Sequence, residues 1–212
     1  MDDEARKRKG KREQLKTEDA VRLALVLFLL LVGIFALPLA ARSAPLTGNE
    51  VYIKADGSVS PSTAPIRRDG NVYTLTGNIS NSIVVERDNI TLDGAFYTLQ
   101  GTRYRDGMIV SGRHNVEIMN IEIRGFSTGL IIQVSRNITV LHSVIVENEM
   151  SGIFLSFASN NSVIGNHTAN DRDQGIRMDD GSNNTIFHNN FIGSFRPVLL
   201  TGSGPNVWDD GY

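Results

Sequence analysis

The sequence contains no cysteine, so neither a disulfide framework nor a thiolate metal site can form. Its net charge is −2, whereas proteins that grip nucleic acid through phosphate contacts are strongly basic. Beyond residue 42 there are 12 basic and 17 acidic residues, a net charge of −5, and Lys54 is the one lysine among them. These shortages argue against a nucleic-acid partner and against a domain surface that contacts anionic headgroups.

One long apolar run is present, "LALVLFLLLVGIFALPLAA" at residues 23–41. A helix needs about 20 apolar residues to span a bilayer, whereas the core of a signal peptide has roughly 7–15. Eight Lys and Arg residues precede the run and Arg42 follows it, which predicts an N-terminus inside the cell and a C-terminal domain outside. We therefore expect a single-pass membrane anchor. The alternative is a signal peptide cleaved after Ser43, which would give a secreted protein.

The rest of the chain is a repeat of about 23 residues. An asparagine opens each copy, with spacings of 22, 23, 23 and 23 residues, and a glycine recurs with spacings of 22, 23 and 23. Val198 takes the next glycine place. Two independent columns in one register indicate a true repeat. The members of the two columns are Asn115, Asn137, Asn160, Asn183 and Asn206, and Gly107, Gly129, Gly152 and Gly175.

Apolar residues alternate after each opening asparagine and again after each glycine, as in Val116 and Ile118 or Leu130 and Ile132. A period of two is typical of strands, and the Gly, Asn, Ser and Asp residues in between favour tight turns. Two or three short strands in about 22 residues describe one rung of a parallel β-helix, and we expect about five to six rungs. The predicted fold is all-β, a right-handed single-stranded parallel β-helix with an N-terminal transmembrane or signal helix.

Stacked rungs place equivalent residues about 4.8 Å apart, so apolar residues should form continuous inward columns. The repeated asparagines should stack at a corner, where each side-chain amide can donate to one neighbour and accept from the other. We interpret them as architecture rather than as ligand contacts. The two predicted inward columns are Leu92, Ile118, Val140, Val163 and Ile186, and Ile123, Ile145, Thr168 and Phe191.

The repeats resemble the right-handed β-helix repeats of NosD-type periplasmic proteins, within the wider carbohydrate-binding and sugar-hydrolase (CASH) group. The resemblance spans residues 51–212 and includes "SIVVERDNITLDGAFYTLQGT" and the closing "NVWDDGY". It implies a non-catalytic binding module or an accessory protein to a transporter or to metalloenzyme maturation. The expected organisation is a charged cytoplasmic tail at 1–22, an anchor or signal segment at 23–41, a linker and lead-in at 42–70, and a β-helix at 71–212. In the family the pattern usually continues past "NVWDDGY", so we expect that this chain is either a fragment or a member that lacks its C-terminal cap.

Acidic residues cluster in "NDRDQGIRMDDGS", where Arg177 lies among Asp171, Asp173, Asp179 and Asp180. Paired carboxylates in a groove could hydrolyse a sugar by acid and base catalysis, so these four are the candidate catalytic residues. The alternative is a solvated corner with a local ion pair. The sequence resembles pectin-cleaving hydrolases only at the adjacent Asp179 and Asp180, which favours a protein that is not an enzyme.

The histidines do not form an expected metal site. His142 and His188 share a column but are two rungs apart, roughly 9.6 Å at twice the strand spacing. That separation is too large for one ion with ligands at about 2.0–2.1 Å, and Gly165 occupies the rung between. We therefore predict no metal and no cofactor.

An outward column is unexpectedly apolar. Arg177 belongs to it, and its other members are Ile109, Ile131, Phe154 and Leu200. Such a stripe is either covered by a loop or terminus or contacts a partner, so Arg177, Ile131 and Phe154 are candidate binding residues. Asn-x-Ser/Thr sequons also make Asn78, Asn89, Asn137 and Asn166 candidate glycosylation sites, a weak signal in an asparagine-rich repeat.

Three functions follow from these observations. The first is an extracytoplasmic module, anchored or secreted, that binds a polysaccharide or another envelope component without catalysis. The second is a carbohydrate-active hydrolase or lyase that uses residues 171–180. The third is an accessory protein of the NosD kind, with a protein partner at the outward apolar stripe.

Overall fold

The computed structural model describes residues 50–209, and all of the regular structure in them is β-strand. All of these strands belong to one compact unit, which begins at residue 48. Within the described residues no helix is long and apolar enough to cross a bilayer. The predicted anchor at 23–41 lies outside those residues.

Three sheets contain the 21 strands. Sheet A has eight strands: β2 (Val59–Ser60), β1 (Val51–Ile53), β5 (Ile83–Val85), β8 (Met108–Ser111), β11 (Thr128–Gln133), β14 (Ser151–Ser156), β17 (Gln174–Asp179) and β20 (Arg196–Thr201). Sheet B has eight: β21 (Val207–Asp209), β18 (Thr185–Phe187), β15 (Ser162–Ile164), β12 (Arg136–Leu141), β9 (His114–Met119), β6 (Ile90–Asp93), β4 (Val72–Leu75) and β3 (Ile66–Asp69). Sheet C has five: β19 (Asn190–Ile192), β16 (His167–Ala169), β13 (Val144–Val146), β10 (Glu122–Arg124) and β7 (Thr98–Gln100).

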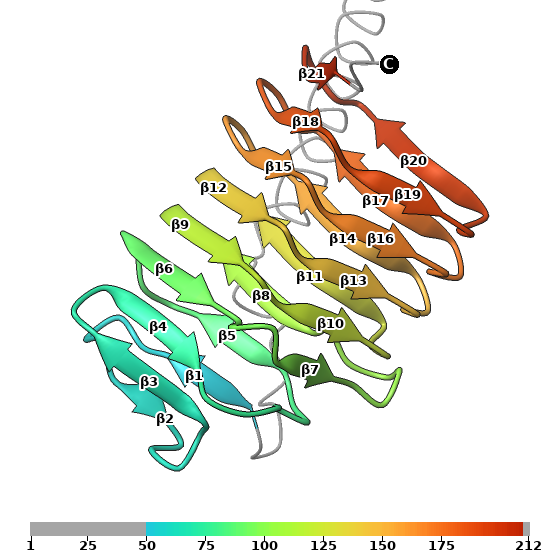
Figure 1. The fold of residues 1–212 in the computed structure, drawn as a ribbon. Helices are drawn as coiled ribbons and strands as arrows, with labels where there is room; N and C mark the ends of the chain where they lie inside the picture. The colour runs from blue at the N-terminus through green and yellow to red at the C-terminus, as the bar shows by residue number, and fades with distance from the viewer. Residues whose placement is uncertain (1–49, 210–212) are drawn as a thin grey trace, which may run out of the picture. The chain divides into compact units, whose positions relative to one another are not determined.

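From β4 onward, successive strands along the chain belong to different sheets, and up to the last turn each pairs in parallel with its equivalent one turn later (Figure 1). This is a parallel β-solenoid of the right-handed type with about six turns, which confirms the predicted β-helix. At its N-terminal end the hairpins β1–β2 and β3–β4 pair antiparallel. The segment expected as a lead-in, 42–70, thus contributes β1, β2 and β3 to the sheets.

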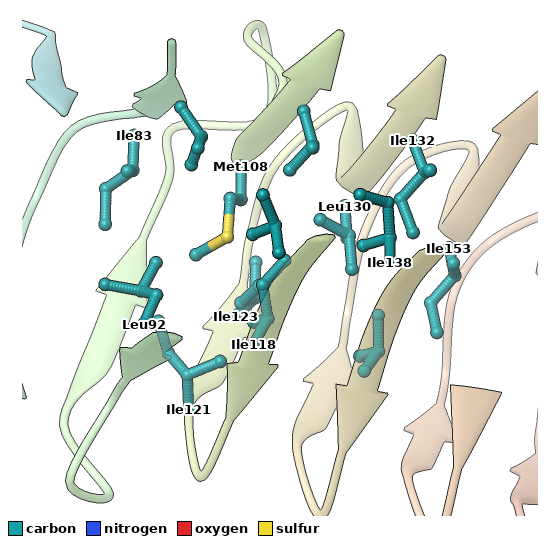
Figure 2. Packing of buried hydrophobic residues seen from close by; sticks show 14 of the residues in the cluster. Ile83, Leu92, Met108, Ile118, Ile121, Ile123, Leu130, Ile132, Ile138 and Ile153 are labelled. Atoms are coloured by element: carbon teal, nitrogen blue, oxygen red, sulfur yellow. The ribbon is translucent and has the colours of Figure 1, made fainter. Parts of the chain in front are cut away.

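The core is a set of stacked apolar columns, and both predicted inward columns are confirmed. Leu92 pairs with Ile118 and Ile118 with Val140, and all three are buried. Figure 2 shows the buried side chains of neighbouring turns, such as Ile118, Leu130 and Ile153, gathered between the strands. Because each turn buries its apolar residues against the turns above and below, no turn has a core of its own.

The glycine column has a steric cause. A Cβ atom on Gly107 would lie 2.4 Å from the carbonyl oxygen of Gly129 in the next turn. A Cβ on Gly129 would lie 2.7 Å from that of Gly152, and one on Gly152 2.7 Å from that of Gly175. Contacts this short are excluded, so at this corner the close approach of successive backbones selects glycine.

The opening asparagines lie at a corner in the left-handed conformation, with φ between 54° and 57° at Asn89, Asn115, Asn137, Asn160 and Asn183. In the first turns their side chains form the predicted ladder. Nδ2 of Asn115 donates to Oδ1 of Asn89 at 2.8 Å, and Nδ2 of Asn137 donates to Oδ1 of Asn115 at 3.1 Å. These side chains are exposed, so the opening asparagine serves mainly the backbone conformation.

The asparagine after it, in the "SNN" sequences, forms a buried ladder that sequence analysis missed. The backbone N–H and Nδ2 of Asn161 both donate to Oδ1 of Asn184 at 2.9 Å. Nδ2 of Asn184 in turn donates to the carbonyl oxygen of Ala158 at 3.0 Å and to Oδ1 of Asn206 at 3.0 Å. A second buried ladder joins Asn166 to Asn189 in the same way. One amide of Asn184 thus satisfies both a backbone N–H, that of Asn161, and a backbone carbonyl, that of Ala158, in the preceding turn.

The predicted alignment of the last turn is wrong by one residue. Asn190 pairs with His167, 23 residues earlier, but Arg196 pairs with Gln174, 22 residues earlier, so the corner between them is one residue shorter. Asn206 therefore stacks on Asn184 rather than on Asn183.

The same shift moves two further positions. Pro197, not Val198, follows Gly175 in the glycine column, because its carbonyl oxygen lies 2.7 Å from the Cβ position of Gly175. Leu200 pairs with the inward Met178 rather than with Arg177, and Leu199 takes the outward place.

We predict that Asn184→Leu lowers the free energy of unfolding by about 3–5 kcal/mol, because each buried backbone group left without a partner costs about 1–3 kcal/mol. Asn183→Gly, one residue earlier at an exposed left-handed position, should change stability by less than about 1 kcal/mol. Urea denaturation of the full-length chain measures both. Equal effects of the two changes would contradict a buried ladder that the fold requires.

Candidate functional site

The outer face of sheet A carries the predicted binding residues in one column. Ile131 pairs with Phe154 and Phe154 with Arg177, so the three side chains follow one another along the solenoid axis. All three are half-buried. The column begins with Tyr52, passes through Val84 and Ile109, and continues to Leu199.

Arg177 makes two contacts on this face. Its guanidinium lies 5.0 Å from the centre of the Phe154 ring, a cation–π contact. Its Nε donates to Oδ1 of Asp179 at 3.1 Å, and Nη2 donates to Oδ2 of the same carboxylate. The two charges offset each other, so the face is close to neutral around the Phe154 ring.

A polar column runs beside the apolar one. Gln133 pairs with Ser111 and with Ser156, and Ser156 pairs with Asp179, so these side chains also repeat once per turn. The face therefore has an apolar stripe beside a row of hydroxyl, amide and carboxylate groups, in which Ser156 is buried and Ser111, Gln133 and Asp179 are accessible. Such a surface can contact the apolar faces of a polymer and hydrogen-bond to its edges.

The four candidate catalytic carboxylates do not converge. Asp171 is buried, whereas Asp180 is exposed at a corner with φ of 52°. Asp173 is bound by Arg196, whose Nε donates to Oδ1 at 2.9 Å, and Asp179 is bound by Arg177. Each of the two paired acids is held by an arginine, and none of the four lines the two cavities described next.

Two cavities lie elsewhere in the described part of the chain. A groove of about 390 Å³ on sheet B is lined by the first asparagine ladder together with Thr91, Glu117 and Thr139. A second cavity of about 420 Å³ lies at the last turn, against Phe191, Val198 and Trp208. Sequence analysis did not identify either one, although the recurring Asn-x-Thr pattern marks part of the first.

Asp171 occupies an asparagine position in a buried ladder. The backbone N–H and Nδ2 of Asn148 donate to its Oδ1 at 3.0 and 2.9 Å, the same geometry that joins Asn161 to Asn184. An asparagine at this position would have the donor Nδ2 where Asp171 has Oδ2. The Oδ2 atom of Asp171 has no hydrogen-bond partner. Burial raises the pKa of Asp171 to about 7, although the two donors of Asn148 lower it in part.

The histidines remain separated. His142 and His188 lie at equivalent corners two turns apart, with Gly165 between them, since the N–H of His142 bonds to Ile164 and that of Gly165 to Phe187. The imidazole of His142 lies over Gly165, 3.0 Å from where a Cβ atom would be. Among residues 50–209 no three His, Asp or Glu side chains gather closely enough to bind a metal ion.

The predicted glycosylation sites differ in accessibility. Asn78, Asn89 and Asn137 are exposed. Asn166 is buried, and its Nδ2 donates to the carbonyl oxygen of Val140 at 2.9 Å and to Asn189 at 3.0 Å. In the folded protein Asn166 is therefore closed to a glycosyltransferase.

The fold and the repeat define the class of protein, a parallel β-solenoid. Residues 43–208 match the family model described as "Periplasmic copper-binding protein (NosD)". The chain belongs to the NosD family, as the repeats predicted. A family described as periplasmic supports a location outside the cytoplasm.

Two solved structures resemble the chain. The enzymatically active domain of tailspike protein 2 of bacteriophage CBA120 has a TM-score of 0.51 at 11% identity, over 76% of this chain and 30% of that one. The periplasmic alginate epimerase AlgG has a TM-score of 0.38 at 20% identity, over 60% of this chain and 44% of that one. The chain thus spans less than half of either protein, and the likeness concerns the fold. No curated protein matches the sequence significantly.

The copper in the family's description does not fit the described residues. There is no cysteine, His142 and His188 are two turns apart, and no cluster of three His, Asp or Glu side chains is present in the part of the chain described. Oδ2 of Asp171, which has no hydrogen-bond partner, is a hard carboxylate oxygen, unlike the soft ligands that copper(I) prefers.

We predict that Asp171 makes the fold less stable as the pH rises. A pKa raised from 3.8 to about 7 means that the folded protein holds a proton that the unfolded chain releases. Asp171 makes its full contribution to the free energy of unfolding below about pH 4. That contribution, about 4 kcal/mol, is lost as the pH rises from about 4 to 7. Urea denaturation at pH 5 and pH 8 should show the loss in the wild type.

Asp171→Asn should remove that loss, since an amide stays neutral and restores the missing donor. Asp180→Asn, at an exposed corner, is the matched control and should leave the pH dependence as in the wild type. A wild type and an Asp171→Asn variant with the same dependence on pH would show that Asp171 is ionised in the folded state.

For metal binding, we predict that the full-length chain retains no stoichiometric copper after dialysis, whereas Gly165→His does. Histidine at 165 would complete a column with His142 and His188 at about 4.8 Å spacing, and both of those already adopt the positive φ that this corner requires. Copper content measured by atomic absorption checks both proteins. Stoichiometric copper in the wild type would contradict our interpretation of the histidines.

Proposed function

We propose that this protein is an extracytoplasmic β-helix module, held at the membrane through its N-terminal segment, that binds a polysaccharide along the outer face of sheet A. The observation that carries the proposal is the contact between Phe154 and Arg177 within a column of apolar side chains, beside a polar column in the same register. The anchor, its orientation and its possible cleavage stay predictions from the sequence.

The repeat of this face favours a polymer. Apolar side chains at Ile131 and Phe154, and accessible polar groups at Ser111 and Gln133, recur with the turn spacing of about 4.8 Å. A ligand that meets several turns at once gains many small contacts in place of one deep pocket. A polysaccharide has the matching chemistry, since its sugar rings carry apolar faces and hydroxyl edges.

The described residues favour binding over catalysis. A glycosidase places two carboxylates about 5–9.5 Å apart across a cleft. Here Asp171 is buried in a ladder, Asp173 and Asp179 are paired with arginines, and Asp180 is exposed. The proposed role is therefore non-catalytic. The second candidate, an accessory role of the kind implied by the family name, would use the same face for a protein partner.

We expect the full-length protein, in a mild detergent, to bind at least one polysaccharide on a glycan array without releasing reducing sugar. Phe154→Ala and Arg177→Ala should each weaken binding roughly tenfold, or about 1.4 kcal/mol. Thr139→Ala on sheet B serves as the control and should leave binding unchanged.

Release of sugar that disappears in Asp179→Asn/Asp180→Asn would make the protein an enzyme and overturn the proposal. No binding to any glycan, together with co-purification of a membrane protein that Phe154→Ala abolishes, would instead support the accessory role.

A further inference from the structure

The corner that follows each long strand of sheet A has left-handed backbone in five consecutive turns. The values of φ are 65° at Gly112, 49° at Val134, 48° at Phe157, 52° at Asp180 and 62° at Gly202. Backbone hydrogen bonds hold this column in register, as from the N–H of Val134 to Ser156 and from that of Phe157 to Asp179. The conformation is therefore a property of the corner and not of one turn.

Three of the five residues suit this conformation, and Val134 and Phe157 do not. Glycine adopts positive φ without steric cost, and aspartate is among the residues that tolerate it. A β-branched or bulky residue there is a true outlier that stores strain. At the same corner, the neighbouring turns have residues that tolerate positive φ, namely Gly112 before this pair and Asp180 and Gly202 after it.

Packing does not explain the choice. Val134 is 52% exposed and Phe157 62% exposed, so neither side chain contributes much to the core. A Cβ atom built on Gly112 would meet nothing within 4 Å, which indicates that the corner opens to solvent. Two apolar side chains are therefore kept both strained and exposed, a combination that costs stability and that the core does not require.

The pair borders the proposed binding face. Val134 follows Gln133 directly, and Phe157 follows Ser156, so the polar column lies between this pair and the apolar stripe of Ile131 and Phe154. A ligand over the polar column would thus have apolar groups on both flanks.

We propose that Val134 and Phe157 are the second apolar wall of the polysaccharide site and grip sugar rings that hydrogen-bond to the polar column between the walls. This inference rests on the proposed function. It assigns a ligand class, a polysaccharide with uncharged rings, because the accessible polar residues Ser111 and Gln133 are neutral and Arg177 is offset by Asp179. An aromatic ring such as Phe157 supplies a large rigid apolar contact.

The test replaces both residues by one that prefers the same backbone. Val134→Asn/Phe157→Asn keeps a residue that tolerates positive φ and removes the apolar wall. We expect the midpoint of thermal unfolding to rise by about 2–6 °C, as strain is relieved, while affinity falls at least tenfold. Affinity is measured by retardation of the full-length protein in gels that contain a soluble glucan, a mannan or, for comparison, a polyuronate.

Phe96→Asn is the matched control. Phe96 is also exposed, at 81%, with φ of 62°, but it lies at the corner between β6 and β7, away from sheet A. It should show the gain in thermal stability with no change in retardation. Phe157→Tyr keeps a ring and should retain binding.

The outcomes separate the two proposals. If no polymer retards the wild type, the proposed function fails and this inference fails with it. If the wild type binds, Phe154→Ala weakens it and the asparagine double variant binds normally, this inference alone is overturned. A lower unfolding midpoint in the double variant would also overturn it, because Val134 and Phe157 would then support the fold. Stronger retardation by the polyuronate than by either neutral polymer would refute the ligand class.

Discussion

Parallel backbone hydrogen bonding between successive turns is the constraint from which the rest of this structure follows. Because each strand pairs in register with its equivalent one turn later, every side chain faces a copy of its own position about 4.8 Å away. Each position therefore favours a residue type whose side chains can pack or hydrogen-bond with the equivalent residues in the turns above and below. Aliphatic side chains do so in the core, glycine does so where two backbones nearly touch, and asparagine does so where turn amides need a partner.

The same constraint makes departures from a column informative. Asp171 stands where the ladder calls for an asparagine, and its second oxygen is left without a donor. Pro197 occupies the column position that holds glycine in the four preceding turns, and it lies just after the corner that is one residue shorter. Val134 and Phe157 occupy a corner where glycine and aspartate are available in neighbouring turns. A repeat supplies its own reference, so each exception can be judged against copies within the same chain.

Membership in the NosD family and a solenoid body place this protein among extracytoplasmic β-helix proteins, while the side chains on its surface decide what it can bind. The surface of sheet A is an extended, nearly neutral face with alternating apolar and polar rows. The family's description refers to copper, but the residues described here do not gather ligands for it. Function within such a fold depends on which outward columns carry matched side chains, since the inward ones are required by the core.

The sequence by itself determined the repeat, the strand periodicity, the inward columns and the alignment of Ile131, Phe154 and Arg177 on one face, because a period of two and a turn of about 23 residues leave little freedom in register. Only the tertiary structure decided which asparagine of each pair is buried, that Asp171 is enclosed, and that the last turn is one residue shorter. Each of these depends on how a corner directs its side chains. Alternation ends at a corner, and there the next turn, which is remote in the sequence, determines whether a polar group meets solvent, a carbonyl oxygen or another amide.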